Sequence, residues 1–100
     1  MSIISTVILV HGEYQEDEIK VVNHVRRFFY DKTMELTDVT DYVESERGPE
    51  CKILIGAFNY FDHEDFFKHL AKYRWQIPEQ VACVVTSNDL YGTWIWRPVV

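Results

Sequence analysis

The chain has 100 residues, of which 47% are hydrophobic and 26% charged, and its formal net charge is -6. This length and composition predict one folded domain, residues 1–100, rather than a disordered chain. The acidic balance argues against nucleic acid as a partner, because a nucleic-acid backbone requires a basic surface. The apolar stretch from Ile3 to Val10 is too short to span a bilayer, so we expect no membrane association and a cytoplasmic location.

The first half of the chain predicts a strand, a helix and a second strand. Ile3 to Val10 is a β-branched apolar run that ends at His11-Gly12, which is typical of a buried strand followed by a turn. The segment from Glu13 to Asp31 predicts a helix, because apolar residues recur there at helical spacing, at Ile19, Val22, Val25 and Phe29. Met34 to Val39 predicts a weaker strand, and a polar segment follows.

The second half predicts a strand, a helix and another strand. The strands are Lys52 to Gly56 and Val81 to Val85, both continuously apolar. Asp62 is the predicted N-cap of the helix between them, whose inward stripe is Phe66, Leu70 and Tyr73. A loop from Ser87 to Gly92 leads to Thr93–Arg97, a short strand or an extended tail. Pro98 confines any such strand to an edge.

Two architectures fit this order of elements. Apolar strands joined by a helix are typical of a parallel sheet covered on both faces. This favours a small α/β sandwich of flavodoxin type, with three layers and a parallel sheet in the order 2-1-3-4. The alternative is a ferredoxin-like βαββαβ sandwich, which results if Met34 to Val43 forms a long hairpin with the third strand.

Two loops are the candidate ligand site. In parallel sheets, ligands bind beyond the carboxyl ends of the strands, where we expect the loops that begin at Asn59 and Ser87. Aromatic side chains on these loops could stack on a flat ligand, or fold back onto the core as clasps. The polar residues among them could bind a ligand or simply form turns.

The same two loops resemble the flavodoxin-like activator of class Ib ribonucleotide reductase, the NrdI family. The resemblance covers roughly Ile53 to Trp94, and it rests on Ile53–Ala57, Asn59–Phe61, Phe67–Tyr73 and Ser87–Gly92. It implies an FMN-binding electron-transfer protein whose partner is a metal-binding subunit of the reductase. The cofactor-binding residues that it implies, together with the turn after the first strand, are His11, Gly12, Glu13, Tyr14, Asn59, Tyr60, Phe61, Ser87, Asn88, Asp89, Leu90, Tyr91, Gly92 and Trp94.

The turn after the first strand departs from that family's pattern. Flavodoxin-like proteins hold the phosphate on a loop rich in Ser, Thr and Gly at a helix N-terminus. Here Glu13, Glu16 and Asp17 occupy this region, and their carboxylates would compete with a phosphate for the same amides. The alternative function is therefore a non-enzymatic, acidic interaction module, an inhibitor or adaptor without a cofactor, whose charge favours basic protein partners.

No sequence motif predicts stand-alone catalysis or a metal site. The chain has no nucleophile elbow and no Walker sequence. The His and acidic residues from Asp62 to His69 lack the spacing that places two imidazoles on one helical face. Cys51 and Cys83 are expected to be free thiols buried in or beside strands.

Overall fold

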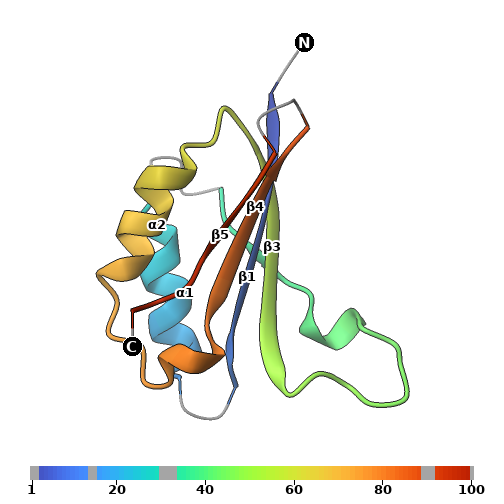
Figure 1. Cartoon of the computed structure of the whole chain (residues 1–100). Helices are drawn as coiled ribbons and strands as arrows, with labels where there is room; N and C mark the ends of the chain where they lie inside the picture. The colour runs from blue at the N-terminus through green and yellow to red at the C-terminus, as the bar shows by residue number, and fades with distance from the viewer. Residues whose placement is uncertain (1–2, 14–15, 30–33, 89–91, 100) are drawn as a thin grey trace.

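The computed structural model describes residues 3–13, 16–29, 34–88 and 92–99, which form one sheet and two helices (Figure 1). In chain order the elements are β1 (Ile4–Gly12), α1 (Glu18–Arg26), β2 (Thr37–Asp38), the 3₁₀ turn η1 (Thr40–Tyr42), β3 (Cys51–Asn59), α2 (His63–Ala71), the 3₁₀ turn η2 (Pro78–Gln80), β4 (Ala82–Ser87) and β5 (Thr93–Trp96). Among these residues, no helix is long and apolar enough to cross a membrane.

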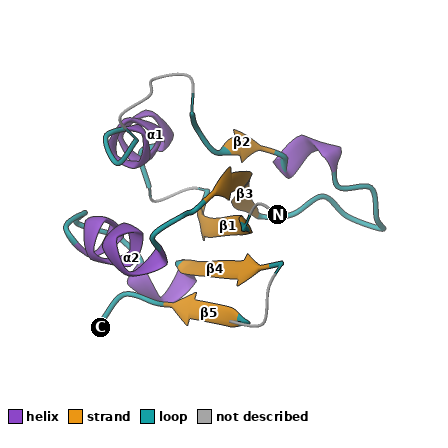
Figure 2. Ribbon diagram, turned by 90° about the horizontal axis from the view of Figure 1, so that it is seen from above, coloured by secondary structure: helices purple, strands orange, loops and turns teal. Residues whose placement is uncertain are grey.

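The sheet is antiparallel, which contradicts the parallel sheet predicted from the sequence. Its strand order is β2-β3-β1-β4-β5, and each neighbouring pair that the structure describes runs antiparallel. Both helices lie on the same face of the sheet (Figure 2). The flavodoxin-like sandwich with strand order 2-1-3-4 is therefore wrong. The ferredoxin-like alternative is compatible with the βαββαβ order from β1 to β4, to which β5 adds an edge strand.

The sequence predicted a parallel sheet because the central strands carry apolar side chains on both of their faces. Along β1, Val7 and Leu9 are fully buried toward the helices, whereas Ile8 and Val10 lie on the other face and are half-buried. Both faces of the strand are apolar, although helices cover only one of them. A continuous apolar run usually indicates a strand covered on both sides, so this pattern imitates a parallel sheet.

The hydrophobic core lies between the sheet and the two helices. Strand residues that alternate along β1, β3 and β4 meet the inward residues of α1 and α2, as expected for a half-covered sheet. Val81, just before β4, completes the cluster. Its members are Val7, Leu9, Val21, Val25, Leu54, Phe66, Leu70, Val81, Cys83 and Val85.

Both helices begin at an aspartate that caps them. The Asp17 carboxylate accepts hydrogen bonds from the backbone N–H groups of Ile19, at 3.1 Å, and Lys20, at 3.2 Å. The Asp62 carboxylate accepts from the N–H of Asp65, at 3.0 Å. The predicted cap at Asp62 is thus confirmed. The helix predicted from Glu13 to Asp31 is shorter than expected, since α1 spans only Glu18–Arg26.

The inward faces of the helices are predicted with mixed success. On α1 the buried residues are Val21 and Val25, whereas Ile19 is 73% exposed. The predicted stripe is therefore wrong at Ile19, because each helix residue is rotated about 100° from the one before it, which places Ile19 nearly opposite the buried Val21. The predicted Val22 is half-buried. On α2, Phe66 and Leu70 are fully buried as predicted. Tyr73 lies beyond the end of the helix and is half-buried.

The two edge strands, β2 and β5, match their predictions to different extents. β2 pairs with β3 through only two residues, so the predicted strand from Met34 to Val39 is mostly loop. At the opposite edge, Thr93–Trp96 forms β5 and pairs with β4. The strand alternative for this segment is confirmed, at an edge as Pro98 requires.

β1 defines two ends of the sheet, called here the upper and lower ends as drawn in Figure 1. At the upper end, the first residue of β1, Ile4, pairs with Asn59, the last residue of β3. At the lower end, Gly12 pairs with Cys51, the first residue of β3. A nine-residue strand rises ~3.3 Å per residue, so the two ends lie roughly 25 Å apart.

A buried carboxylate joins the start of α1 to the loop before η2 at the lower end. Glu16 is 5% exposed, and its Oε1 accepts hydrogen bonds from the N–H groups of Gln76, at 2.5 Å, and Ile77, at 2.9 Å. Its Oε2 is buried without a hydrogen-bond partner among the described residues. Glu16 thus holds together two segments that are 60 residues apart in the sequence.

Candidate functional site

A groove of about 770 Å³ opens between the end of α1, one side of α2 and the upper end of β3. We call it the aromatic groove, because the rings of Phe28, Phe29, Phe58, Tyr60 and Phe61 line it. Its volume falls within the range of about 300–1,000 Å³ that is usual for ligand pockets. The groove forms where both helices meet the strand end that sequence analysis placed at a ligand site.

The phenylalanines of the groove form one connected cluster on top of the core. The fully buried Phe66 of α2 contacts Phe28 edge-on, with ring centroids 4.9 Å apart, and Phe61, at 5.2 Å. Phe61 in turn stacks against Phe58, at 5.4 Å. Such ring pairs add to the stabilisation that burial provides. The walls of the groove are therefore anchored to the core.

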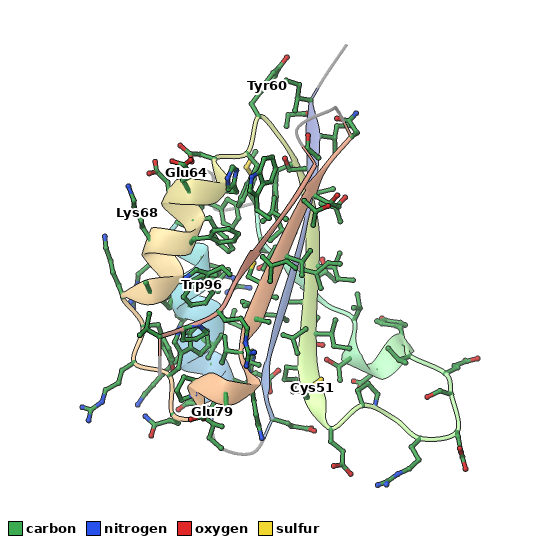
Figure 3. The ribbon with its side chains drawn as sticks, in the orientation of Figure 1. Cys51, Tyr60, Glu64, Lys68, Glu79 and Trp96 are labelled. Atoms are coloured by element: carbon green, nitrogen blue, oxygen red, sulfur yellow. The ribbon has the colours of Figure 1, made fainter. Side chains whose placement is uncertain are left out.

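Tyr60 lies at the rim of the groove and has an unusual backbone. It is the only non-glycine residue with a positive φ, 52°, among the described residues, and its side chain is 72% exposed. Figure 3 shows this side chain pointing away from the molecule at the upper end. Its N–H donates a hydrogen bond to the carbonyl of Ile3, at 3.0 Å. The left-handed conformation costs a residue with a side chain about 1–2 kcal/mol, so strain is stored beside an exposed ring.

A second hollow, of about 480 Å³, lies on the other side of Tyr60 and Phe61. Its wall contains a stacked pair, His63 of α2 and Trp94 of β5, with ring centroids 3.9 Å apart and planes 14° from parallel. Ser87 also lines it. Tyr60 and Phe61 thus stand between two hollows and belong to both.

The charged residues of the aromatic groove are separated by sign. Lys68 and Lys72 lie in the second half of α2 and just beyond it, and Arg27 is the C-cap of α1. Arg27 and Lys72 are close enough to the same histidine, His24, to influence its protonation. Asp62 and Asp65 lie at the start of α2. One end of the groove is therefore basic in a protein whose net charge is -6, and the other end is acidic.

Two histidines join the helices at the basic end. His24 of α1 and His69 of α2 stack with ring centroids 4.1 Å apart and planes 18° from parallel. The Nε2–H of His24 donates to the carbonyl of His69, at 2.7 Å, and the Nε2–H of His69 donates to the carbonyl of His24, at 2.5 Å. A carbonyl oxygen only accepts, so each Nε2 carries a hydrogen. The pair is a reciprocal clamp between α1 and α2.

The clamp makes stability depend on pH. Burial lowers the pKa of His24 below its ordinary value of 6.5; the hydrogen bond to the His69 carbonyl opposes this shift, while His69, Arg27 and Lys72 add to it. The unfolded chain therefore binds a proton at His24 more readily than the folded chain, and stability is lost as pH falls below 6.5.

We expect the free energy of unfolding, measured with urea, to decrease between pH values of about 7.5 and 5. In His24→Gln the amide can still donate to the His69 carbonyl, so the decrease should become smaller. An identical pH dependence in the two proteins would contradict this assignment.

The structure brings most of the predicted upper-end residues together. Asn59, Tyr60 and Phe61 line the aromatic groove, and Ser87 and Trp94 line the second hollow beside it. The backbone of Asn88 pairs with Ile4, and its Oδ1 accepts from the N–H of Ile4, at 2.9 Å. Asn88 thus has a structural role in fixing the start of β1. Gly92 has a φ of 88°, and its carbonyl accepts a hydrogen bond from Ser87, which closes the turn into β5.

The predicted phosphate-loop residues lie elsewhere. His11, Gly12 and Glu13 are at the lower end, because β1 runs antiparallel to both of its neighbours. His11 is 1% exposed, and its Nδ1 donates to the carbonyl of Gly12, at 2.8 Å. One FMN molecule cannot contact these residues and the upper-end loops at once. The described members of the predicted cofactor set therefore lie in two separate places, at opposite ends of the sheet.

Four predicted residues lie outside the described part of the chain: Tyr14, Asp89, Leu90 and Tyr91. Conversely, sequence analysis missed several groove residues, among them Phe28, Phe58 and Lys68, and it missed the contact between His24 and His69 beside the groove. The adjacent aromatic residues Phe28 and Phe29 were a usable signal, because only one of two neighbours can lie on the buried stripe of a helix. No local signal pairs the histidines, which are 45 residues apart.

The described residues offer little nucleophilic or metal-binding chemistry. Both cysteines are free, as predicted, but only Cys83 is fully buried. Burial raises the pKa of the Cys83 thiol to about 12, so it is not a thiolate at neutral pH. Among these residues there is no group of three or more His, Cys, Asp and Glu side chains placed to hold a metal ion.

Comparison with known proteins found no matching family model, no matching curated protein and no matching solved structure.

Proposed function

We propose that this protein is a non-enzymatic interaction module that binds a short segment of a partner protein in the aromatic groove. The segment would place an aromatic or large aliphatic side chain against the Phe58 and Phe61 walls. The volume of the groove, about 770 Å³, is enough for one such anchor and its neighbours. Anchors of this kind, seated in apolar pockets, supply most of the affinity at protein interfaces.

The observation that carries this proposal is the exposed ring of Tyr60 on a strained backbone. Tyr60 is 72% exposed and has a φ of 52°, so neither burial nor backbone preference explains a tyrosine at this position. Strained residues persist where the surrounding structure holds them, and they cluster at binding sites. Tyrosine is also enriched at interfaces, because it offers a rigid, amphipathic surface. A role in contact with a partner accounts for both features.

The charges of the groove define the chemistry of the segment. Arg27, Lys68 and Lys72 favour acidic residues on one side of the anchor, and Asp62 and Asp65 favour basic residues on the other. The bound segment would then have a fixed direction along α2. This local preference differs from the basic partners that the net charge alone suggested, because contacts at the rim respond to nearby charges more than to distant ones.

Selection of short random peptides on the immobilised protein tests the proposal. Enriched peptides should contain an aromatic residue with acidic residues on one side, and their affinity should fall as salt is added. The double variant Lys68→Glu with Lys72→Glu should bind them about tenfold more weakly.

The matched control for the charge reversal at Lys68 and Lys72 is Lys20→Glu. Lys20 is an exposed lysine of α1 that does not line the groove. It should leave the affinity unchanged. Failure to enrich any peptide, or equal losses in the double variant and in Lys20→Glu, would contradict the groove as the binding site.

FMN-dependent electron transfer is a second candidate function. It is favoured by one observation, that Asn59, Tyr60 and Phe61 line a groove with aromatic walls and a basic end. The rings would stack on the isoalloxazine and the cations would pair with the phosphate, without help from His11 to Tyr14. Bound FMN would supply redox chemistry. Purified protein that is colourless and does not quench the fluorescence of added FMN would end this candidate.

The proposed partner depends on which candidate holds. If FMN binds, the partner implied by the resemblance is a metal-binding subunit of ribonucleotide reductase, and purified subunit should be retained by the immobilised protein. If a peptide segment binds instead, the enriched sequences define the partner. A cytoplasmic location is part of both proposals.

A further inference from the structure

The outer edge of β3 is paired along only part of its length. β3 has nine residues, and β2, which lies beside it at the edge of the sheet (Figure 2), pairs with two of them. Before Thr37 the chain leaves the sheet, and Glu35 there bonds to Arg26 of α1, with Oε2 and Nε 2.7 Å apart. Toward the upper end, the stretch from Gly56 to Asn59 therefore has no strand on this side among the described residues.

The strand register shows which backbone groups of β3 point to this edge. In an antiparallel sheet, successive residues of a strand direct their N–H and C=O groups to opposite neighbours. The carbonyl of Ile53 accepts a hydrogen bond from the N–H of Val39, at 2.9 Å, on the β2 side. Ala57 and Asn59, which follow at even spacing, therefore point the same way. Both are exposed, and their outward backbone groups have no hydrogen-bond partner in the described part of the chain.

This edge lacks the usual protection against further pairing. Sheet edges are commonly protected by charged residues, by proline or by a short strand. At the opposite edge, β5 has four residues and is followed by Arg97 and Pro98. The stretch from Gly56 to Asn59 contains neither a charged residue nor a proline. Its unpaired donors and acceptors form a template for an additional strand.

The aromatic groove lies directly beside this edge, and Phe58, Asn59 and Tyr60 line it. Side chains alternate between the two faces of a strand, so Phe58 points to the helix side, as the buried Leu54 does. Residues that lie opposite one another in neighbouring strands share a face. A strand added here would therefore direct every second side chain into the groove.

We propose that the segment bound in the aromatic groove adds to β3 as a sixth strand of the sheet. This inference rests on the proposed function and defines the ligand further, as an extended segment of a partner protein with large apolar side chains at alternate positions. Its backbone would bond to Ala57 and Asn59, and its alternate side chains would contact Phe58. In such complexes the main chain supplies affinity and the alternate side chains supply specificity.

The length and charge of the edge favour a short partner segment over a second copy of this chain. From Ile55 to Asn59 the edge measures about 13 Å, which matches about five residues of extended chain. Each copy of the protein has a net charge of -6, which opposes the pairing of two copies at the same edge.

The variant Ala57→Pro tests the proposal on the peptides selected with the full chain. Proline removes an N–H that points outward, and it is tolerated at such positions of an edge strand. The affinity should fall at least about tenfold, with folding checked by circular dichroism. Ala57→Val keeps the N–H and a residue suited to strands, so it should leave the affinity unchanged.

Ile95→Pro is the matched control at the opposite edge. Ser87 donates a hydrogen bond to Gly92 on the β5 side, so by the same alternation Val84 faces β1. Ile95, the β5 partner of Val84, therefore points its N–H outward, as Ala57 does. Ile95→Pro should leave the affinity for the peptides unchanged. Equal losses in Ile95→Pro and Ala57→Pro would overturn the proposal.

N-methylation of the peptide, one backbone nitrogen at a time, tests the same pairing without altering the protein. Only alternate N–H groups of an added strand face β3. The affinity should therefore fall at least about tenfold at every second position and stay unchanged at the positions between. This series decides the question even if Ala57→Pro fails to fold.

The outcomes separate strand addition from binding in the groove. If Lys68→Glu with Lys72→Glu weakens binding while Ala57→Pro and N-methylation have no effect, strand addition is wrong and the groove remains the site. The opposite pattern would support strand addition and contradict the charged end of the groove. If no peptide is enriched, both proposals fail. Dimerisation of the wild type that Ala57→Pro abolishes would assign the edge to a second copy and overturn the inference.

Discussion

Replacing Phe66 with alanine is expected to lower the free energy of unfolding by about 3–5 kcal/mol, the usual cost of truncating a buried phenylalanine. Phe66 is fully buried, and it supports two walls of the aromatic groove through Phe28 and Phe61. Its removal leaves a cavity between α2 and the sheet that these rings cannot fill without moving. Urea titration followed by circular dichroism measures the change.

The neighbouring Phe67 is the matched control for this substitution. It is half-buried and contacts His63 and Trp96 at the side of α2 that faces β5. Phe67→Ala should cost about 1–2 kcal/mol, because less apolar area leaves water when this ring folds. Equal losses of stability in the two variants would contradict the role of the buried Phe66 in supporting the walls of the groove.

Replacing Glu16 with alanine is expected to lower the free energy of unfolding by about 1–3 kcal/mol. The substitution removes the acceptor of two backbone hydrogen bonds, from Gln76 and Ile77. Those N–H groups would lose their partner in a part-buried loop. Hydrogen exchange at these two amides should accelerate together with the loss of stability, because the same carboxylate holds both.

Glu16→Gln separates the hydrogen bonds from the charge. The amide oxygen can still accept from Gln76 and Ile77, and the variant removes a carboxylate whose Oε2 is buried without a partner among the described residues. Its stability should therefore stay within about 1 kcal/mol of the wild type. A loss as large as that of Glu16→Ala would mean that the negative charge, rather than the two bonds, stabilises this loop.

The elements of the fold that depend on nearby residues were predictable. The cap at Asp62 and the buried pair Phe66 and Leu70 follow from local hydrogen bonding and helical spacing. The direction of the sheet was not predictable from the same patterns. Ile8 and Val84 lie on a face without helices, yet they are as apolar as residues that helices cover, so the sequence imitated a parallel sheet.

In the candidate site, too, some positions were predictable from nearby residues and others were not. The loops that contain Tyr60 and Ser87 were placed correctly at one end of the sheet, because the strands that precede them end there in either architecture. The turn at His11 was placed at the wrong end, since its position depends on the direction of β1. The clamp between His24 and His69 joins residues that only the packed helices bring together, so no local pattern could have predicted it.

The most direct test of the aromatic groove as a binding site is a paired measurement on Tyr60→Gly. Glycine adopts a positive φ without strain, and the lost ring is 72% exposed. The free energy of unfolding should therefore stay the same or rise by up to about 1 kcal/mol. The affinity for the selected peptides should nevertheless fall at least about tenfold, because the ring is part of the contact. Unchanged affinity, or a loss of stability that accounts for weaker binding, would contradict the proposal.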